Sequence, residues 1–524
     1  MPPTRRWATD MGELILPIAV REAVTLLADW VIVLPVVLAL LGAALTLMLG
    51  RTRAILAVLV TLAVLACDVA LLLRVFADGP LSMTMGNWLP PFGISLTADL
   101  FGALFASAAA LVTLMVLLYA ETERTASNDG DGYHALVLLL LAGVSGAFLT
   151  GDLFNLYVWF EVTLIASFGL LVGVGKPLQL DGAVKYGILN FLATTLFLLA
   201  LGLLYGLLGT LNMADIFRVA PAANPTALTG IAGLLLLAFG AKAAAFPLNA
   251  WLPASYHTPP AVVSALFAAL LTKVGAYALL RTLVTVLPGS RDVLEPVLLA
   301  IAVTSLLIAP LGAIAETNLR RAIGFLVIGG IGAIFAGLAL AGQGGIAGAG
   351  FYIVHAMLSL TALYLVAGLI ERRTGATDTR QMGGLYAASA PLSILFFALI
   401  LGMASVPPTL GFWPKLLLLE AALVQGDWQG WLLIGALLIN AVLTLIAGTR
   451  LWSAIFWREA AVPAVLAPDT RDRLRQGITM LVVSLVLAAG LWPNPLFEIV
   501  QRGAAQMLDQ AGYAAAVGLA GGIP

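Results

Sequence analysis

The stretch that decides the fold is FGAKAAAFPLNAWLPASYHTPPAVVSALFAALLTKVGAY, residues 239–277. It places Lys242 and Lys273 in apolar runs of the length that transmembrane helices need, and four prolines lie between them. A lysine near the middle of the hydrocarbon costs about 2.5 to 3.5 kcal/mol on insertion scales, so such residues are rare and usually face the protein interior. We therefore expect membrane helices that carry functional lysines.

The composition of the whole chain supports a membrane protein. Of its 524 residues, 61% are hydrophobic and 10% are charged, whereas about 25% are charged in soluble proteins. The net charge of -1 and the lack of interleaved basic and aromatic residues exclude nucleic acid as a partner. Cys67 is the only cysteine, and motifs of nucleotide-binding or hydrolytic sites are missing, so we expect no metal, no cofactor and no enzyme activity.

Hydropathy with a window of about 20 residues predicts an all-α polytopic membrane protein of about fourteen transmembrane helices. The predicted spans are 29–50, 54–76, 98–120, 134–150, 153–174, 183–208, 226–250, 260–281, 293–315, 321–341, 349–370, 386–425, 430–457 and 475–492. Prolines interrupt the seventh and the twelfth span, near Lys242 and near Lys415. Corresponding broken helices are typical of two inverted repeats with sites at the breaks; the alternative is a pair of kinked helices without a role in transport.

The spans suggest four parts of the chain. These are N-terminal helices with an outer hairpin at 77–97 (1–130), a first repeat (131–285), a second repeat (286–457), and a last span with a C-terminal tail (458–524). Residues 13–28 are expected to form a short helix rather than a cleavable signal peptide, and 211–222 either a brief surface helix or a plain loop. Arginines concentrate in alternate loops, which places both termini outside by the positive-inside rule.

Glu161 lies within the fifth span, with no basic residue nearby in sequence. An unpaired buried carboxylate takes up a proton, so Glu161 is either neutral or paired with a lysine of another helix, for which Lys242 is the natural candidate. A change in the distance between the two groups would capture or release a proton. The alternative is a static ion pair that only holds two helices together.

Two histidines extend this pattern. His355 lies inside the eleventh span, and His257 lies in the turn between spans seven and eight. Histidine titrates near neutrality, so each is either a proton relay or a polar residue at a helix interface. The predicted proton path is Glu161, Lys242, Lys273, His355 and Lys415, linked by water, with His257 as a candidate relay.

Other ionisable residues are assigned to different roles. Asp68 in the second span is either a second carrier or a contact with another subunit. His134, at the entrance of a span, is expected to be solvated. Asp99 and Asp152 lie at span ends and are expected to reach toward the membrane surface.

The chain resembles the antiporter-like subunits shared by Mrp-type cation/proton antiporters and respiratory complex I. The resemblance covers nearly the whole length and is carried by FNLYVWFEV (154–162), FPLNAWLP (246–253), HTPPAVVSALFAALLTKVGAY (257–277), ETNLRRAIGF (316–325) and the lysine in SVPPTLGFWPKLLLLE (405–420). Within this family, MGNWLPPFGI (85–94), a lysine at position 415 and a length without a large C-terminal extension favour the D-type subunit of the Mrp antiporter.

The resemblance implies function and partners. It implies a proton-translocating subunit of a multisubunit Na⁺/H⁺ antiporter, with Na⁺, or K⁺ in its place, exchanged against protons in a bacterial inner membrane beside subunits of types A, B, C, E, F and G. The alternative is a proton-pumping subunit of an NADH:quinone or hydrogenase-type oxidoreductase. A further alternative is a structural subunit in which the charges only hold helices together. Several relatives carry a lysine where this chain has Ser359, so the link from Lys273 to Lys415 would depend on His355 and water.

Overall fold

The structure is a computed structural model that describes residues 27–49, 52–88, 90–123, 132–173, 175–340, 342–459 and 471–519. Its first helices are η1 (Leu27–Ile32), α2 (Leu34–Met48), α3 (Arg53–Asp78), α4 (Leu100–Glu123), α5 (Tyr133–Leu149), α6 (Leu153–Val172), α7 (Pro177–Leu208), α8 (Met213–Val219), η3 (Ala220–Ala222), α9 (Pro225–Ala243) and α10 (Trp251–Ser255). The second half contains α11 (Ala261–Leu280), η4 (Arg281–Val286), α12 (Pro288–Ala315), α13 (Leu319–Ala339), α14 (Gln343–Thr374), α15 (Leu385–Ala388), α16 (Ala390–Met403), α17 (Phe412–Gln425), α18 (Trp428–Trp452), η5 (Ser453–Trp457), α19 (Asp472–Leu491), α20 (Asn494–Leu508) and α21 (Gln510–Ala516).

Most of these helices have the length and composition of membrane spans. Among the described residues, eleven helices are long and apolar enough to cross a membrane, counting η4 with α11 and η5 with α18. Three shorter helices, α2, α5 and α16, are also apolar. The prediction of an all-helical polytopic membrane protein is confirmed.

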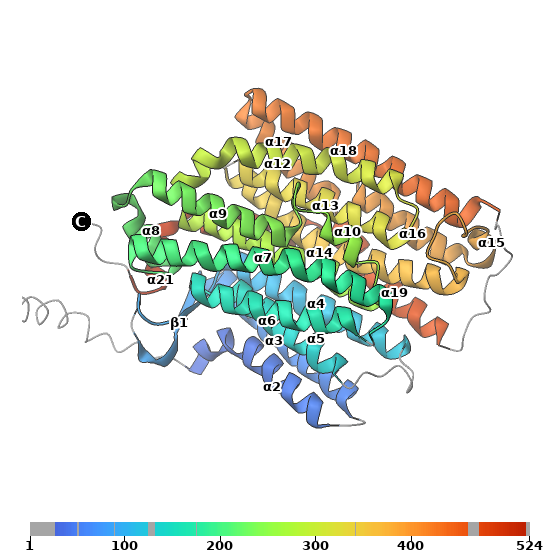
Figure 1. The fold of residues 1–524 in the computed structure, drawn as a ribbon, viewed down its shortest axis with the longest axis horizontal. Helices are drawn as coiled ribbons and strands as arrows, with labels where there is room; N and C mark the ends of the chain where they lie inside the picture. Colours follow the sequence, from blue (N-terminus) through green and yellow to red (C-terminus); the bar gives the residue numbers. More distant parts are fainter. Residues whose placement is uncertain are drawn as a thin grey trace, which may run out of the picture.

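The helices of the bundle run in broadly similar directions, roughly along its longest axis (Figure 1). The helices follow the chain from one side to the other: α2 and α3 lie at one edge, α7 and α9 in the middle, and α17 and α18 at the opposite edge (Figure 1). The C-terminal helix α20 returns to pack against α14 and α4. The last helices therefore lie against helices from both halves of the chain, α4 and α14.

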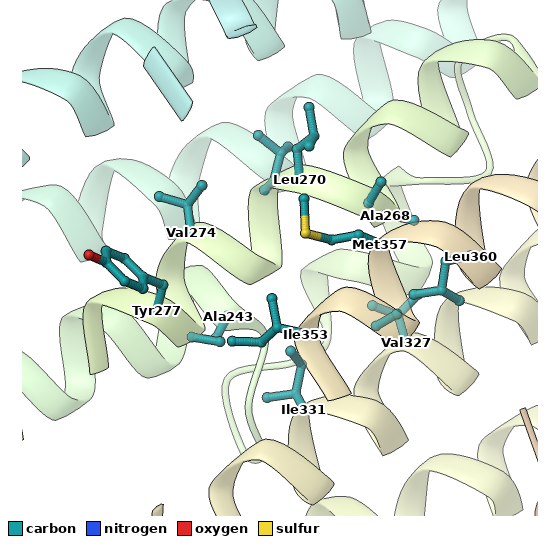
Figure 2. Close-up of a cluster of buried hydrophobic side chains, with 14 of the residues drawn as sticks. Ala243, Ala268, Leu270, Val274, Tyr277, Val327, Ile331, Ile353, Met357 and Leu360 are labelled. Atoms are coloured by element: carbon teal, nitrogen blue, oxygen red, sulfur yellow. The ribbon is translucent and has the colours of Figure 1, made fainter. Parts of the chain in front are cut away.

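The core lies where α11, α13 and α14 meet. The membrane-length part of α11 is buried along its whole length, and α13 and α14 are buried almost as completely, whereas α3, α7 and α19 expose most of theirs. Figure 2 shows side chains of these helices packed together, with Ile353 and Met357 of α14 beside Ala243 of α9 and Leu270 of α11. Apolar faces that remain exposed on the outer helices suit contact with lipid or with other membrane subunits.

Several smaller predictions can be compared with the structure. The hairpin expected at 77–97 is present as β1 (Leu81–Thr84) and β2 (Ser95–Ala98), paired antiparallel with Leu81 opposite Ala98, and the turn between them contains η2 (Met85–Asn87). Of the two alternatives at 211–222, a brief helix or a plain loop, the structure forms the helix, as α8 followed by η3. The helix expected at 13–28 lies outside the described residues, apart from its last two positions. The C-terminal helices α20 and α21 were not predicted.

Candidate functional site

The helix that carries Lys242 ends one residue after it. α9 ends at Ala243, Ala244 adopts a left-handed conformation with φ of 59°, and the next helix begins at Trp251. Neighbouring side chains bind the backbone groups that the break leaves free: Trp251 Nε1 donates to the carbonyl of Ala241 at 3.0 Å. Because buried backbone groups must be paired, these contacts hold the break in one conformation.

Lys242 is buried at this break, beside α11. A methyl group added at Gly275 of α11 would lie 2.8 Å from the backbone nitrogen of Ala243, so the glycine permits the two helices to approach closely. The ammonium of Lys242 lies 5.5 Å from the ring centroid of Phe160, the residue before Glu161, in a cation–π arrangement. The amine of the first broken helix therefore faces α6.

The expected direct pair of Glu161 and Lys242 is not formed. Within the described residues, no ion pair or hydrogen bond joins the two side chains, although they lie within Coulombic range of each other, and Oε1 of Glu161 is buried without a hydrogen-bond partner. The direct pairing was wrong because α6 presents the Phe160 ring to the lysine. The carboxylate and the amine remain neighbours that a small movement or a water molecule could connect.

A small cavity adjoins Lys242. Its lining includes Lys242, Thr163, Tyr186 and Asn190. Its volume, taken as the space that the centre of a water molecule can occupy, is about 10 Å³. That is about the space that one water molecule needs, and the lining supplies polar partners for it. The cavity can therefore hold the kind of bridging water that a proton transfer between fixed groups requires.

Lys273 lies on α11 in the centre of the bundle. Its Nζ donates to the carbonyl of Ala268 at 2.7 Å and to Oγ1 of Thr272 at 3.0 Å. Both acceptors are uncharged groups of the same helix. Lys273 therefore makes two hydrogen bonds, neither of them to a carboxylate.

His355 on α14 faces the second break, between α16 and α17. Its Nδ1 and Oγ of Ser359 are 3.1 Å apart, and Nε2 is buried without a hydrogen-bond partner in the described part of the chain. A methyl group added at Gly411, within the break, would lie 2.9 Å from Nε2. The ring lies within Coulombic range of both Lys273 and Lys415, so it is a neighbour of both lysines.

Lys415 is buried in the first turn of α17. Its Nζ donates to Oδ1 of Asn440 on α18 at 2.8 Å. Sequence reasoning missed Asn440, although the signal was present as a single amide residue inside the apolar run ALLINAVL (436–443). Lys242, Lys273 and Lys415 are all buried, with 8%, 1% and 4% of their surface exposed. Lys273 and Lys415 donate only to uncharged acceptors.

His257 lies apart from this row, in the turn between α10 and α11. Its Nδ1 donates to the carbonyl of Pro253 at 2.9 Å, which leaves Nε2 as the acceptor of the neutral ring. Burial lowers the pKa of His257 below its ordinary value, and the nearby guanidinium groups of Arg321 and Arg320 act in the same direction. The ring is therefore neutral at pH 7.

This pKa shift predicts an acid sensitivity that His257→Gln should reduce. The unfolded chain takes up a proton on this histidine at higher pH than the folded chain, so acidification below about pH 6.5 removes stability. We expect the melting temperature of the variant to fall less than that of the wild type between about pH 7.5 and 5.5. Thermal unfolding of the purified complex at the two pH values measures this, and equal falls would contradict it.

Two expectations about other ionisable residues were wrong. Asp99 does not reach the membrane surface, because it forms a buried ion pair with Nη2 of Arg281. The same Nη2 also donates a hydrogen bond to the hydroxyl of Tyr277 at 2.9 Å. His134 is not solvated: its Nε2 lies 2.7 Å from Oε1 of Glu121, because the end of α4 packs beside the start of α5. Asp152 caps α6 by accepting from the backbone nitrogen of Asn155 at 2.8 Å.

Breaking the buried pair should destabilise the protein strongly. Arg281→Met leaves the carboxylate of Asp99 buried without its partner, which typically costs about 3 to 5 kcal/mol. We expect a large fall in melting temperature, and a smaller one when Asp99→Asn is added to Arg281→Met. Arg380→Met, which removes an exposed pair with Asp378, is the control and should change little. Equal stability of Arg281→Met and wild type would contradict the prediction.

The role of Asp68 does not follow from its neighbours. It lies on the buried stripe of α3, and neither carboxylate oxygen has a hydrogen-bond partner among the described residues. Its assignment as a carrier or as a contact with another subunit stays a prediction. Among all the residues that the structure describes, no group of three or more histidine, cysteine, aspartate or glutamate side chains is placed to hold a metal ion.

A known protein family and its members match this chain. The family described as NADH:quinone oxidoreductase/Mrp antiporter, transmembrane, matches residues 150–444. The D-type subunit of the Na⁺/H⁺ antiporter of Bacillus subtilis is 34% identical over 492 residues, which cover 93% of this chain and 99% of the relative. The corresponding protein of Alkalihalophilus pseudofirmus is 35% identical over 450 residues, covering 86% and 90%.

A solved structure agrees with these relatives. A chain of the Mrp complex from Dietzia sp. DQ12-45-1b superposes with a TM-score of 0.86 at 28% identity, and the match covers 95% of this chain and 100% of that one.

The fold and the row of buried amines define the class: a polytopic helical membrane subunit with ionisable side chains inside the bundle. The chain belongs to the NADH:quinone oxidoreductase/Mrp antiporter family, and within it to the D-type subunits of the Na⁺/H⁺ antiporters.

Proposed function

We propose that the chain is the proton-translocating subunit of a multisubunit Na⁺/H⁺ antiporter, in which protons move along Glu161, Lys242, Lys273, His355, Lys415 and intervening water. The chain acts as a transporter subunit and not as an enzyme. His257 is the candidate relay at the turn before α11.

The observation that carries this proposal is the chemistry of the groups around the lysines. Within the described residues, the hydrogen-bond acceptors of Lys273 and Lys415 are a carbonyl, a hydroxyl and an amide oxygen, and no carboxylate lies in an ion pair with any of the three buried lysines. An uncharged oxygen accepts a hydrogen bond from an amine as well as from an ammonium. The surroundings of these lysines therefore favour neither the amine nor the ammonium so strongly that proton release or uptake is prevented.

The proposal includes the membrane topology. Eleven helices of membrane length and three shorter apolar helices support fourteen crossings, with α16 and α17 together forming the twelfth. The breaks after Lys242 and before Lys415 support two inverted repeats, at 131–285 and 286–457, flanked by the parts at 1–130 and 458–524. With both termini outside, the arginine-rich loops face the cytoplasm.

The setting of the chain is also part of the proposal. We place it in the inner membrane of a bacterium, in a complex with chains of the A, B, C, E, F and G types, where it exchanges Na⁺, or K⁺ in its place, against protons. The two bacterial relatives support this setting because they are antiporter subunits, and the likeness to a chain of the Mrp complex supports the assembly.

The test uses inside-out vesicles from a host without its own antiporters, in which the chain is expressed with its genomic neighbours. A proton gradient is built by respiration, and Na⁺ is added to wild type and to Lys415→Ala after assembly of each complex has been confirmed. We expect Na⁺ to collapse the gradient in the wild type and not in Lys415→Ala. A response of the same size in both would remove Lys415 from the path.

The second candidate function is that of a proton-pumping subunit of an NADH:quinone or hydrogenase-type oxidoreductase. The family is shared between antiporters and such enzymes, and the same buried row could serve either. In the vesicle experiment, a gradient built by NADH through the expressed complex, with no response to Na⁺, would favour this candidate. Flavin and iron–sulfur chains that purify with the complex would support it independently.

A further inference from the structure

We propose that Asn440 is a positioning residue of the proton path, whose amide holds the amine of Lys415 and also lines a water-sized cavity. The inference rests on the proposed function and extends it to a residue that the row of titratable groups does not include. Asn440 lies in the middle of α18 and is 3% exposed. A buried amide is costly unless its oxygen and nitrogen are both paired.

Both ends of the amide are paired, and with different helices. Oδ1 accepts from Nζ of Lys415 on α17 at 2.8 Å, and Nδ2 donates to the carbonyl of Leu306 on α12 at 2.7 Å. A lysine can only donate and a carbonyl can only accept, so these partners determine which way the amide is oriented. Asn440 therefore connects the second broken helix to α12.

The carbonyl of Leu306 can accept from Asn440 because it has no backbone donor within α12. Pro310 lies inside α12, four residues after Leu306. Proline has no N–H, so the carbonyl four residues before it loses its partner within the helix. Asn440 supplies the missing donor. The proline thus creates an acceptor at a defined point of the helix, and the acceptor anchors the amide that holds Lys415.

A cavity adjoins the anchored amide. Its lining includes Asn440, Pro310, Gly329, Tyr352 and Thr444. Its volume, taken as the space that the centre of a water molecule can occupy, is about 10 Å³. This is about the room that one water molecule needs, and the amide, the tyrosine hydroxyl and the threonine hydroxyl are polar. Gly329 keeps the space open, since a methyl group there would lie 3.3 Å from Nδ2 of Asn440.

The arrangement matches the one around Lys242. At the first break Lys242 itself lines the cavity together with Asn190, Tyr186 and Thr163. At the second, the cavity is lined by Asn440, which binds Lys415, and by Tyr352 and Thr444. A proton that leaves the row at this end would pass from the lysine to a water held beside the amide.

Two substitutions at Asn440 separate positioning from simple support. Asn440→Ala removes both hydrogen bonds, and we expect the rate of Na⁺-induced proton movement to fall by about 10-fold or more, because loss of alignment by about 1 Å has effects of that size. Asn440→Asp keeps the size of the side chain and places a carboxylate beside the amine of Lys415. A carboxylate favours the ammonium form, so we expect the activity profile to move toward alkaline pH by about one unit or more.

The experiment compares wild type, both variants and Lys415→Ala in the vesicle assay over a range of pH, with assembly of each complex confirmed. Thr449→Ala is the control on the same helix, since Thr449 binds only carbonyls of α18, and it should keep the wild-type rate and profile. An alkaline shift in Asn440→Asp supports the proposal even if Asn440→Ala fails to assemble.

Three results would overturn the proposal. They are wild-type rates and profiles in both variants, lower rates without any movement of the pH profile, and failure of both variants to assemble, since the last two describe a structural residue. Failure of the proposed function is a different result, because the wild type itself would then show no response to Na⁺.

Discussion

Lys242→Met is expected to abolish Na⁺-induced proton movement while the complex still assembles. Methionine is similar in length to lysine and apolar, so the variant removes the titrating amine without creating a large cavity. It also removes the cost of burying an amine in the membrane, about 2.5 to 3.5 kcal/mol on insertion scales. The vesicle assay should show a loss of at least about 10-fold, of the size that a missing acid–base group produces. The melting temperature of the complex should stay level or rise.

Lys185→Met is the matched control for this loss. Lys185 lies on α7, is half exposed and pairs with Asp181 at 2.5 Å, so it is a lysine outside the buried row. Exposed pairs contribute little to stability, and we expect wild-type transport in this variant. Transport by Lys242→Met at the wild-type rate would leave the lysine a purely structural role and would contradict the proposed path.

Gly411→Ala should also abolish transport, for a steric reason. The added methyl group would lie 2.1 Å from the carbonyl oxygen of Gly402 and 2.8 Å from Cε1 of His355. Contacts this short force the backbone of the break or the histidine ring to move, and overpacking of a buried site typically costs about 1 to 3 kcal/mol. The displaced ring would change its position relative to Lys273 and Lys415, which are both within its Coulombic range. We expect little or no Na⁺ response from a complex with a lowered melting temperature.

Gly402→Ala tests whether the effect comes from the contact rather than from glycine itself. Gly402 lies at the end of α16, on the other side of the same break, and a methyl group there would have Cβ of Thr409 at 3.9 Å as its nearest neighbour. We therefore expect transport close to that of the wild type. Equal losses in both variants would mean that the break needs flexible glycines, and equal retention would mean that His355 does not depend on Gly411.

Much of the fold and of the candidate site can be predicted from local patterns. A lysine in an apolar run of membrane length has few places to lie except the bundle interior, and Lys242, Lys273 and Lys415 are all buried. Prolines mark the ends of α9 and α16 because they cannot continue the hydrogen-bonding pattern of a helix. The hairpin at β1 and β2 follows from turn residues between alternating strands.

The contacts across the bundle could not be predicted from the sequence. Asp99 and Arg281 are 182 positions apart, and Asn440 and Leu306 are 134 apart, so no periodicity relates them. Their meeting depends on how α4, α11, α12 and α18 pack. The orientation of Glu161 was missed for a similar reason, since the rotation of α6 about its axis decides that Phe160 and not the carboxylate faces Lys242.

Complete burial of α11 restricts the motions that transport can use. The helix is enclosed by α9, α13, α14 and α4, so a rocking of one half of the subunit against the other would bring its apolar side chains into contact with water. Burial of apolar surface is worth about 25 cal/mol per Å², and a cleft along a whole span would forfeit that gain at every turn. We therefore expect protons on the proposed path to move by rotation of side chains and exchange of single waters, inside a scaffold that keeps its shape.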